Sequence, residues 1–595
     1  MANPLKAFWR DAKFGLRLLR VLRLFGDLKP DDARTIADDF EEVIDVHPNK
    51  VAFVFEGEST TYRQFEERAN RVANWAMSQG LTAGDVVALD LENCPDFVAI
   101  WFGLSKIGVA TALINTNLEG EGLSHCIGIV DAKAVIAGGV QAERAKACLA
   151  NLNAQLELWD IDGVHGHDLA LALKGQRATR PGRVGRENLK GKDIALFIYT
   201  SGTTGLPKAA KITHMKIRGA GRTSKALVRI EAKDRLYITL PLYHITGGGL
   251  GVVGALSMGA TIILRRKFSA TEFWDDVADN NASLFVYIGE LCRYLLSAPD
   301  HPKQNSHTLR AGFGNGLRGE VWRPFVERFQ VPTMRELYGS TEGNVSFLNI
   351  DGTIGAIGQM PGWMGSKIGM ELVKFDVVEE RPIRGADGFC IRADVDEPGE
   401  VLGKITDVGR QDFSGYHDKK ATEAKILTDV FEQGDKWFRT GDLIRRDADN
   451  YLYFVDRIGD TYRWKGENVA TNEVADVMSK YPSVELANVY GVEVPGFEGK
   501  AGMAAITVGA DFSMTGFADH LRTGLPAYAV PLFIRIQHEA ETTGTFKFRK
   551  VELVKEGFDP ERTDDPMWFL APGVEQFIAL DGSIHTRIVN GEYRL

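Results

Sequence analysis

A short segment in the first half of the chain holds the residues whose types and spacing best suit chemistry. Six consecutive small or hydroxyl-bearing residues are followed, three positions after the last of them, by Lys208. Backbone N–H groups and hydroxyls in such a loop can approach phosphate oxygens closely, because no bulky side chain stands in the way. Lys208 adds a point charge. The segment therefore predicts a phosphate-binding loop, formed by Thr200, Ser201, Gly202, Thr203, Thr204, Gly205 and Lys208.

The spacing of this loop separates it from the Walker A loop. Its glycines and lysine follow the pattern Gly202-x-x-Gly205-x-x-Lys208, with an alanine after the lysine. A Walker A loop needs G-x-x-x-x-G-K-[ST]. The plain structural alternative is a Ser/Thr/Gly-rich surface loop that binds nothing.

Several other segments carry candidate groups that are weak signals by themselves. Ala311–Arg318 is a second glycine-rich loop. His244 follows a predicted strand, where a lone histidine is usually structural. The neighbouring Gly247–Gly249 lets a backbone or a ligand pass closely. Glu336–Asn344 combines a tyrosine, two hydroxyl-bearing residues and two carboxylates, and its alternative is a solvated turn.

The elements that must position these groups alternate along the chain. The phosphate loop follows Ile194–Tyr199, an apolar run that predicts a buried strand. A predicted helix over Thr61–Gln79 lies between two predicted strands. The predicted strands are Val51–Phe55, Gly84–Asp90, Ala134–Ala137, Leu236–His244, the start of Phe285–Leu296 and Tyr451–Arg457. This alternation predicts an α/β fold with largely parallel strands.

The length of 595 residues predicts more than one domain. We expect a basic helix within residues 1–30 and a large N-terminal domain of mixed and parallel sheets with flanking helices over 31–456. A small mobile α+β C-terminal domain is expected over 457–595, because Val484–Val554 has a strand–strand–helix–strand pattern.

Composition and charge exclude some classes of function. The chain is 44% hydrophobic and 25% charged, which is ordinary for a soluble globular protein. A net charge of −10 argues against general nucleic-acid binding. The five cysteines include no C-x-x-C pair, which predicts reduced thiols and a cytoplasmic location. No apolar stretch approaches the roughly 18 residues of a spanning helix, and no metal-ligand cluster stands out.

The first segment of the chain is unlike the rest. Its basic residues recur at helical spacing and its apolar residues fall on another face, a pattern typical of a basic amphipathic helix on an anionic membrane surface. Packing of the apolar face on the protein itself or on a partner is one alternative, and a targeting segment is another. The basic residues are Lys6, Arg10, Lys13, Arg17, Arg20 and Arg23, and the apolar ones Phe14, Leu18, Val21, Leu22 and Phe25.

The motifs together resemble a known family. The string Tyr199–His214, with Glu336–Asn344 and Trp437–Leu443, is similar to the signatures of the adenylate-forming superfamily of acyl-CoA synthetases, luciferases and peptide-synthetase adenylation domains. Ile458–Val474 resembles its fatty-acid transport protein branch, which contains the very-long-chain acyl-CoA synthetases. Gly108–Leu118 and Phe285–Leu296 also resemble this branch, and the resemblance covers roughly residues 45–595.

The resemblance implies roles for particular residues. The loop would hold the pyrophosphate part of ATP, Thr341 would contact phosphate, and Glu342 would bind Mg²⁺, which prefers oxygen ligands. The remaining nucleotide contacts implied are Gly314, Asn315, Gly316 and Leu317 for adenine, Tyr338 stacked on adenine with Gly339 beside it, and Asp442 and Arg457 on the ribose. The acyl pocket implied is formed by His244, Gly247, Gly248, Tyr287, Ile288 and Gly289.

The C-terminal domain would supply the moving groups. The mobile catalytic lysine implied by the resemblance is Lys547, although Lys550 is close enough to remain an alternative. Most relatives read Thr-Gly-Lys there, whereas a phenylalanine precedes the lysine here. The hinge position, often Asp or Lys in relatives, is Gly459. Trp464, Lys465 and Gly466 would lie on the loop turned toward the site for thioester formation with coenzyme A.

The implied function is ATP-dependent ligation of a long-chain or very-long-chain fatty acid to coenzyme A through an acyl-AMP intermediate, with fatty acid uptake as an associated role. A CoA ligase for another hydrophobic acid, such as a bile acid or a sterol side chain, is one alternative. An acyl-AMP ligase that loads a carrier protein is another. The expected partners are the fatty acid and a membrane surface contacted through residues 5–25, on the inner face of the cytoplasmic membrane. A homodimer is left open, and no nucleic acid is expected.

Overall fold

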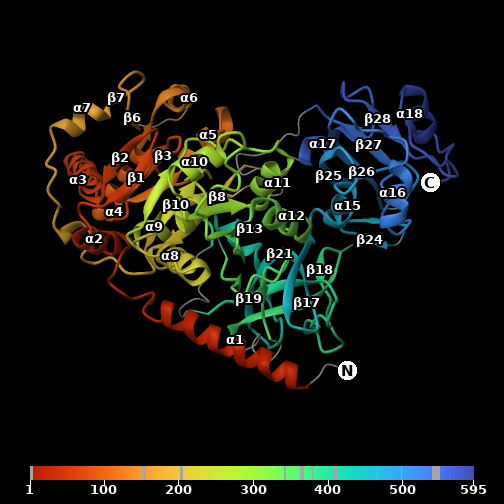
Figure 1. Ribbon diagram of the computed structural model, residues 1–595, viewed down its shortest axis with the longest axis horizontal. Coiled ribbons are helices and arrows are strands. Elements are labelled where there is room, and N and C mark those ends of the chain that lie inside the picture. Colours follow the sequence, from red (N-terminus) through yellow and green to blue (C-terminus); the bar gives the residue numbers. More distant parts are fainter. Residues whose placement is uncertain are drawn as a thin grey trace. The chain divides into compact units, whose positions relative to one another are not determined.

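Strands and helices alternate along most of the chain, as Figure 1 shows for the computed structural model of the protein. The described residues are 4–150, 152, 156–200, 206–340, 343–361, 368–377, 379–406, 413, 415–465, 467–497, 499–538 and 550–595, with side chains for all of these except 4–13, 16, 184 and 551. The chain divides into two compact units. The first is Met1–Gly369 with Gly403–Thr428 and Asp435–Phe438, and the second is Met370–Leu402, Asp429–Gly434 and Arg439–Leu595.

The second unit thus includes segments that precede residue 457. The expected boundaries of a mobile lid, at residues 456 and 457, remain a prediction. Each unit has its own hydrophobic core, as expected for parts that fold as separate bodies.

The first sheet of the first unit carries most of the predicted site. Its central strands β10 to β14 pair in parallel where they adjoin, and an antiparallel strand closes each edge. In spatial order the strands are β15 (Ser346–Asn349), β14 (Met334–Gly339), β13 (Ala311–Asn315), β12 (Leu284–Ile288), β10 (Arg235–Ile238), β11 (Thr261–Leu264), β1 (Val51–Phe55) and β2 (Glu58–Thr61).

The second sheet carries the predicted phosphate loop at one edge. Its strands are parallel except for β9, which pairs antiparallel with β8. In spatial order they are β7 (His167–Asp168), β6 (Glu157–Asp160), β5 (Ala134–Ala137), β3 (Val86–Asp90), β4 (Ala110–Leu113), β8 (Ile194–Thr200) and β9 (Lys208–Thr213). The α/β prediction is confirmed, because parallel strands connected through helices dominate both sheets.

Helices connect and flank these strands. They are α1 (Pro4–Phe25), α2 (Ile36–Val46), α3 (Tyr62–Ser78), α4 (Pro95–Lys106), α5 (Gly120–Gly128), α6 (Gly139–Leu149), α7 (Leu169–Lys174), α8 (His214–Val228), α9 (Gly254–Leu256), α10 (Phe273–Asp279), α11 (Gly289–Ser297) and α12 (Gly319–Phe329), with a 3₁₀ turn η1 (Arg183–Gly185) and a π-helix η2 (Ile245–Val253). Smaller elements of the first unit are β16 (Gly358–Gln359), α14 (Lys419–Glu423) and β20 (Ile426–Thr428).

Local sequence explains where α3 begins. Thr61 caps the helix by accepting a hydrogen bond from the backbone N–H of Gln64, and the Gln64 side chain accepts one from the N–H of Thr61. This reciprocal pair satisfies N–H groups that have no partner inside the helix. The helix then buries Phe65, whose ring lies 5.2 Å from Phe53 of β1 and 5.5 Å from Phe102 of α4. The predicted helix is confirmed, and its apolar face joins the main core.

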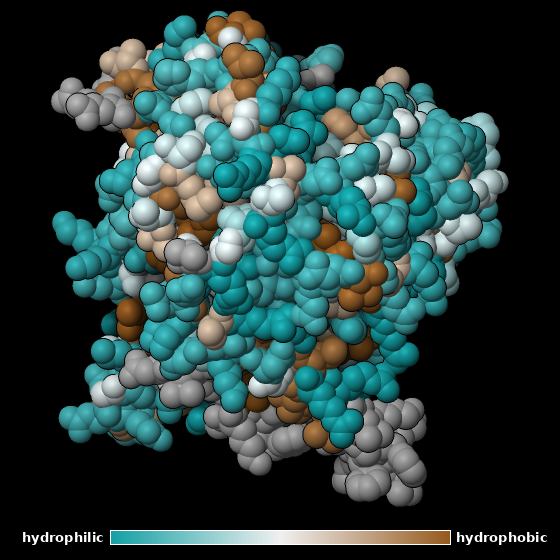
Figure 2. All heavy atoms as spheres, turned by 90° about the vertical axis from the view of Figure 1, so that its left-hand side faces the viewer, coloured by the Kyte–Doolittle hydropathy of each residue, from teal (hydrophilic) through white to brown (hydrophobic). Residues whose placement is uncertain are grey.

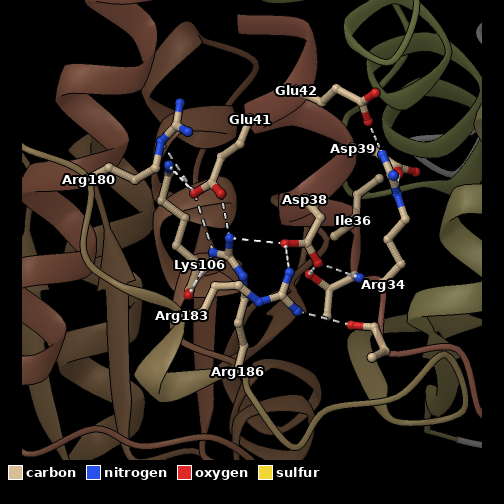
Figure 3. A network of polar contacts seen from close by, with 12 residues as sticks. Arg34, Ile36, Asp38, Asp39, Glu41, Glu42, Lys106, Arg180, Arg183 and Arg186 are labelled. Carbon is tan, nitrogen blue, oxygen red and sulfur yellow. Dashed lines mark hydrogen bonds and ion pairs between the residues drawn. The ribbon is translucent and has the colours of Figure 1, made fainter. Parts of the chain in front are cut away.

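Buried charges link the first helices to one another (Figure 3). Lys106, at the end of α4, is fully buried, and its Nζ lies 2.7 Å from Oε1 of Glu41 in α2 and 2.9 Å from Oε1 of Glu66 in α3. Arg186, after η1, pairs with Glu41 and lies 3.1 Å from Asp38. Buried ions need such partners because losing water is costly. The network therefore joins three helices and the segment that leads toward β8.

The predicted N-terminal helix is confirmed as α1. Part of it packs on the rest of the first unit: Nη1 of Arg17 lies 2.6 Å from Oδ2 of Asp351, and Arg222 of α8 donates to the carbonyl of Leu24. Leu19 and Leu22 on the same helix are 56% and 48% exposed. The packing alternative therefore describes one side of α1, while another side of it faces solvent.

The second unit contains two sheets and a hairpin. Five neighbouring strands of one sheet are, in order, β22 (Tyr451–Arg457), β21 (Lys436–Arg446), β19 (Gly399–Lys404), β17 (Met370–Asp376) and β18 (Arg381–Pro382). The hairpin is β23 (Tyr462–Trp464) and β24 (Glu467–Val469), and the last sheet is β25 (Val484–Glu493), β26 (Lys500–Val508), β27 (Phe533–Ile536), β28 (Met567–Phe569) and β29 (Ile578–Ala579). Its helices are α15 (Thr471–Met478), α16 (Phe517–Gly524), α17 (Lys550–Glu556) and α18 (Gly582–Val589).

The predicted α+β pattern of the C-terminal part is confirmed. Strands β25 and β26 pair antiparallel, α16 follows, and β27 then pairs parallel with β26. The face of the protein in Figure 2 is mainly hydrophilic, and its hydrophobic side chains lie in small groups between polar ones. Among the described helices, none is both long and apolar enough to cross a membrane.

Candidate active site

The residues predicted for the adenine site and the acyl pocket lie at one edge of the first sheet of the first unit. Strands β10, β12, β13 and β14 are neighbours and pair in parallel, so their carboxyl ends lie at the same edge. Open α/β sheets bind ligands outside the carboxyl ends of their strands. The predicted residues at or just after these ends are His244, Gly247 and Gly248 after β10, Tyr287, Ile288 and Gly289 at β12, Gly314, Asn315, Gly316 and Leu317 at β13, and Tyr338 and Gly339 at β14.

Two elements differ from their predictions. The predicted strand Leu236–His244 ends at Ile238, and the buried Leu240 and Leu242 lie in a loop. The predicted loop Ala311–Arg318 is strand β13 through Asn315. In the first case burial of a loop imitates the apolar pattern of a strand. In the second, the neighbouring strand approaches so closely that only glycine fits: a Cβ on Gly314 would lie 1.9 Å from the carbonyl oxygen of Tyr287.

The buried carboxyl of Glu336, in β14, holds the turn after β13. It accepts hydrogen bonds from the backbone N–H groups of Gly316 and Leu317, the latter at 3.3 Å. Its Oε2 also lies 2.9 Å from the hydroxyl of Tyr287 in β12. Burial raises the pKa of Glu336 well above its usual range, while the bonds from Tyr287, Leu317 and Gly316 lower it.

A protonated Glu336 satisfies every polar group in this cluster. The Tyr287 hydroxyl lies 2.9 Å from both Glu336 and the carbonyl oxygen of Arg335, but it has one hydrogen to donate. If Glu336 donates from Oε2 to the Tyr287 oxygen, the Tyr287 hydrogen goes to the Arg335 carbonyl. Oε1 then accepts from the N–H groups of Gly316 and Leu317. The hydroxyl of Tyr287, a predicted pocket residue, therefore bonds within the protein.

The turn after β13 also needs glycine on its other side. A Cβ on Gly289, the first residue of α11, would lie 1.8 Å from the carbonyl oxygen of Gly316. Gly316 itself has φ +80°, in the left-handed region. Gly289, expected in the acyl pocket, thus gives the turn room to form.

The segment after β10 is a π-helix that contacts the turn after β13. Thr246 Oγ1 in η2 donates to Oδ1 of Asn315 at 3.0 Å. Gly247 and Gly248 are buried there. A Cβ on either would lie within 2.4 Å of a carbonyl oxygen in the preceding loop, so a larger residue would not fit. His244 precedes η2, and its ring centroid lies 4.5 Å from that of Tyr243. Irregular helices of this kind are frequent at functional sites.

The ends of the predicted phosphate loop are paired across β8 and β9. Thr200 lies opposite Lys208 in the register of these strands. The Nζ of Lys208 lies 5.7 Å from the ring centroid of Tyr416, which bridges to β9 through Ala210. His125 contacts the loop at the carbonyl oxygen of Pro207, 3.0 Å away. The predicted Ser201, Gly202, Thr203, Thr204 and Gly205 lie outside the described residues.

Tyr338 is half-buried in β14, and its ring stacks against Phe347 of β15 at 5.8 Å. Gly339 follows it at the end of the strand and is exposed. Thr341 and Glu342 lie outside the described residues. Within the described part of the chain, there is no group of three His, Cys, Asp or Glu that could hold a metal ion.

In the second unit, Asp442 and Arg457 face each other across β21 and β22. The Arg457 Nε lies 3.7 Å from Oδ1 of Asp442. The resemblance implied the same ligand for both residues, and the register places them side by side. A carboxylate next to a guanidinium can accept bonds from one hydroxyl pair while the cation donates to the same group.

The remaining predicted residues of the second unit lie near the hairpin β23–β24. Trp464 is buried against Phe497, and Lys465 is at the turn with φ +51°, while Gly466 lies outside the described residues. Gly459 has neither a positive φ nor an atom within 4 Å of an added Cβ. Nothing in this conformation therefore requires glycine there.

The two candidate catalytic lysines differ in what the structure describes of them. Lys547 lies outside the described residues. Lys550 pairs with Asp460 at 3.1 Å and donates to Thr471 at 3.3 Å. These bonds hold Lys550 within the second unit.

Sequence reasoning missed the roles of Glu336 and Tyr416. Glu336 opens the motif Glu336–Asn344, but no spacing rule connects it to an N–H group 20 residues earlier. No sequence pattern pointed to Tyr416, because the residue that it contacts, Lys208, is distant from it along the chain.

Comparison with known proteins decides the family. The family described as AMP-binding enzyme matches residues 40–402, more than half of the chain. The chain belongs to the AMP-binding enzyme family. The AMP-binding enzyme is 40% identical over 603 residues to long-chain fatty acid transport protein 6 of Mus musculus, covering 99% of this chain and 96% of that protein.

Solved structures share the fold of this AMP-binding enzyme. An anthranilate CoA ligase in complex with anthranoyl-AMP has a TM-score of 0.75 at 21% identity, covering 89% of this chain and 98% of that chain. A fatty acyl CoA synthetase of Mycobacterium tuberculosis has a TM-score of 0.63 at 24% identity, covering 88% and 98%. At these identities the likeness concerns the fold.

Replacing Glu336 by Gln tests whether this carboxyl is protonated in the AMP-binding enzyme. Between the pKa of an unfolded glutamate, about 4.3, and the raised folded pKa, the folded chain keeps a proton that the unfolded chain has lost. The stability contributed by Glu336 therefore falls as pH rises, by about 1.4 kcal/mol for each pH unit. The Gln variant lacks this fall, so it should gain stability relative to the unchanged chain as the pH rises above about 5.

Urea unfolding followed by tryptophan fluorescence at several pH values measures this difference. Glu67→Gln, at an exposed glutamate of α3, is the matched control and should run parallel to the unchanged chain. Glu336→Ala should be less stable at every pH by about 1–3 kcal/mol, because it leaves buried N–H groups unpaired. Parallel pH curves for Glu336→Gln and the unchanged chain would mean that Glu336 is ionised throughout.

Proposed function

We propose that this AMP-binding enzyme is a long-chain or very-long-chain fatty acid–CoA ligase. The observation that carries the proposal is the 40% identity, over 99% of the chain, to a long-chain fatty acid transport protein. The clustering of predicted nucleotide and acid residues at the carboxyl ends of β10, β12, β13 and β14 supports it. Uptake of fatty acid would follow from its trapping as a thioester.

The proposed reaction has two steps. A carboxylate is a poor electrophile, so its oxygen first attacks the α-phosphate of ATP to give acyl-AMP and pyrophosphate. The thiol of coenzyme A then attacks the acyl carbon and AMP leaves. The chain's part is to bind, position and stabilise charge, since no protein nucleophile is needed.

Each proposed nucleotide contact has a place in this scheme. The loop Thr200–Gly205 and Lys208 would hold the phosphates, with Thr341 beside them. Gly314–Leu317 and Tyr338 would hold adenine, and Asp442 and Arg457 the ribose. The turn after β13, which Glu336 holds, would form a preformed wall of the adenine site. Less of the chain would then need to become ordered when the nucleotide binds.

The proposed acyl pocket lies beside the adenine wall. It is formed by His244, Gly247, Gly248, Tyr287, Ile288 and Gly289. The bond from Thr246 to Asn315 ties the π-helix of this pocket to the turn after β13.

Mg²⁺ fits the oxygen-donor chemistry next to Tyr338. Among the described residues, Ser340 Oγ is buried and has no hydrogen-bond partner, and the carboxylate of Glu342 follows two positions later. Oxygen donors of this kind, completed by phosphate oxygens, suit Mg²⁺. Glu342 would hold the ion, which when bound would offset the charge of the phosphates.

The proposed moving part is the C-terminal domain, residues 457–595. It would present Lys547 for the first step and then turn about Gly459 to bring Trp464, Lys465 and Gly466 to the site for the second. Gly459 suits a hinge, because an open position with no steric need for glycine in one conformation leaves φ and ψ free to change.

A panel of carboxylic acids tests the substrate class. The full chain with ATP, Mg²⁺ and coenzyme A should form CoA thioesters fastest with long and very long fatty acids. Acetate, benzoate and a bile acid serve as the comparison set, and a phosphopantetheinyl carrier protein replaces coenzyme A in one arm. Preference for a short, aromatic or sterol-derived acid, or for the carrier protein, would overturn the proposal.

Replacing Lys547 by Ala tests the mobile lysine. Its positive charge would stabilise the charge that develops on the α-phosphate, so palmitate-dependent ATP–pyrophosphate exchange should fall about 100- to 1,000-fold. Lys550→Ala is the matched control, because Lys550 already pairs with Asp460 and bonds to Thr471. Its exchange rate should stay near that of the unchanged chain. The reverse outcome would assign the role to Lys550.

We also propose that α1 contacts the inner face of the cytoplasmic membrane. Leu19 and Leu22 are three residues apart, so they share one face, and both are exposed. Basic residues beside them suit an anionic surface. A homodimer stays an open alternative, which sedimentation equilibrium of the full chain would decide.

The double variant Leu19→Ser/Leu22→Ser tests the membrane contact. Losing two leucines that enter the lipid interface should lower partition onto vesicles at least about tenfold, given about 1.5–3 kcal/mol for a fully buried leucine. Val164→Ser/Leu171→Ser, at side chains 71% and 63% exposed, is the matched control and should bind normally. Vesicle sedimentation gives the measurement. Equal binding by both variants would remove α1 from the contact.

A further inference from the structure

A cavity of about 440 Å³ lies behind the N-terminal helix. Its walls come from α1, from the end of α8 with the turn that follows, from the beginnings of β13 and β14, and from the residue after β15. The lining residues are Arg17, Arg20, Val21, Leu24, Lys225, Ala226, Leu227, Val228, Arg229, Ile230, Glu231, Arg310, Ala311, Thr333, Arg335 and Ile350.

This cavity is separate from the candidate active site. It is lined by Ala311, at the amino end of β13, and by Thr333, just before β14. The nucleotide residues proposed on the same two strands, Gly316 and Tyr338, lie at their carboxyl ends. The parallel strands therefore carry the two sites at opposite edges of one sheet.

The lining is strongly basic. It has six arginines or lysines and a single acidic residue, Glu231, in a chain whose net charge is −10. Glu231 pairs with Lys233 at 3.0 Å, outside the lining. The cavity therefore carries an excess of positive charge, whereas the net charge of the whole protein is negative.

Only part of this charge is neutralised by the protein. Arg17 pairs with Asp351 at 2.6 Å, and Arg310 pairs with Asp234 at 2.7 Å. Arg335 lies near both Asp351 and Arg17, and its pKa is lowered by burial. Among the described side chains, Arg20, Lys225 and Arg229 take part in no ion pair. Arg20 lies in α1, Lys225 lies in the last turn of α8, and Arg229 is the residue that follows α8.

Capping of α8 explains some of these residues and not the set. Arg310 donates to the carbonyl oxygen of Val228, at the last turn of that helix. Cations near a helix C-terminus are favoured by its dipole, which suits Lys225 and Arg229. The cations of α1 belong to another helix, and their approach adds like charges to the same space. An anion in the cavity would relieve that repulsion.

The other half of the lining is apolar, which indicates what the anion is attached to. Eight lining residues are aliphatic, among them Val21 and Leu24 of α1. A cationic rim with an aliphatic wall fits an acidic group joined to hydrocarbon. The exposed Leu19 and Leu22 lie on the same helix that closes the cavity.

We propose that this cavity binds the phosphate headgroup of an acidic membrane lipid. The proposal rests on the membrane contact proposed for α1, and adds a specific lipid site to it. Guanidinium groups bind phosphate through paired N–H donors, and the aliphatic wall receives the first part of the lipid chain. The helix would then hold the enzyme at an acidic surface by a saturable site as well as by general attraction.

Titration of the full chain with a short-chain phosphatidic acid, below its micelle concentration, tests the site. We expect saturable one-to-one binding by calorimetry. Arg20→Ala/Lys225→Ala should weaken it about 30-fold, since each cation near an anionic group contributes about a factor of five. Arg23→Ala/Lys29→Ala removes two exposed cations outside the cavity and should bind as the unchanged chain does.

Further arms identify the ligand and separate folding from binding. Short-chain phosphatidylcholine has the same chains without net charge and should not bind, and inorganic phosphate should bind far more weakly. The charge-conserving variant Arg20→Lys/Lys225→Arg should keep most of the affinity. Equal losses in the two alanine pairs, or binding of phosphatidylcholine or free phosphate as tightly as the acidic lipid, would overturn the proposal.

The assay contains no ATP, fatty acid or coenzyme A, so its result is independent of the ligase reaction. An enzyme that forms no acyl-CoA but binds the acidic lipid would refute the proposed function alone. An active ligase that does not bind the lipid would refute the cavity alone.

Discussion

The carboxyl of Glu336 accepts bonds from the N–H groups of Gly316 and Leu317 and lies 2.9 Å from the hydroxyl of Tyr287. It thereby connects three neighbouring strands at the edge where the candidate site lies. A buried carboxyl without partners would be very costly, and these contacts supply them. Because Glu336 and Tyr338 are two residues apart in one strand, they share a face. One carboxyl therefore sets the position of the turn after β13 relative to the tyrosine proposed to stack on adenine.

Close backbone approach is the second condition for this arrangement. The turn can reach Glu336 only because Gly289 leaves room for the carbonyl of Gly316, and because Gly314 leaves room for the carbonyl of Tyr287. In each case a methyl group would overlap a backbone oxygen. The glycines proposed for the nucleotide and acid sites thus have a packing role that precedes any ligand. A substitution at Gly289 would displace the turn even if no substrate touched that residue.

Much of the fold could be predicted from the sequence because its signals are local. The runs Val51–Phe55 and Ala134–Ala137 are strands with the predicted bounds, and the Thr61–Gln64 pair marks the start of α3. Strand β13 was missed because glycine disfavours a strand locally, while the close packing of β12 requires it. The contact of Lys106 with Glu41 spans 65 residues and left no pattern to read.

The same distinction applies to the site. The motifs of Asp442 and Arg457 predict one shared ligand, and the register of β21 and β22 places the two residues opposite each other. The role of Glu336 could not be predicted, because it depends on which strands are neighbours. Sequence motifs identify groups that touch a ligand better than groups that hold those in place. The latter are selected by packing partners that are distant along the chain.

The cations of this chain differ in whether the protein itself supplies their counter-charges. Lys106, Arg218 and Arg535 are buried, and each lies within 3 Å of two carboxylates, so their charges are met inside the protein. The chain has ten more acidic than basic residues, so carboxylates are available. Arg20 and Lys225 nevertheless line one cavity with no ion pair among the described side chains. Because like charges held together destabilise a fold, such a cluster is retained more readily where an anion from outside offsets it.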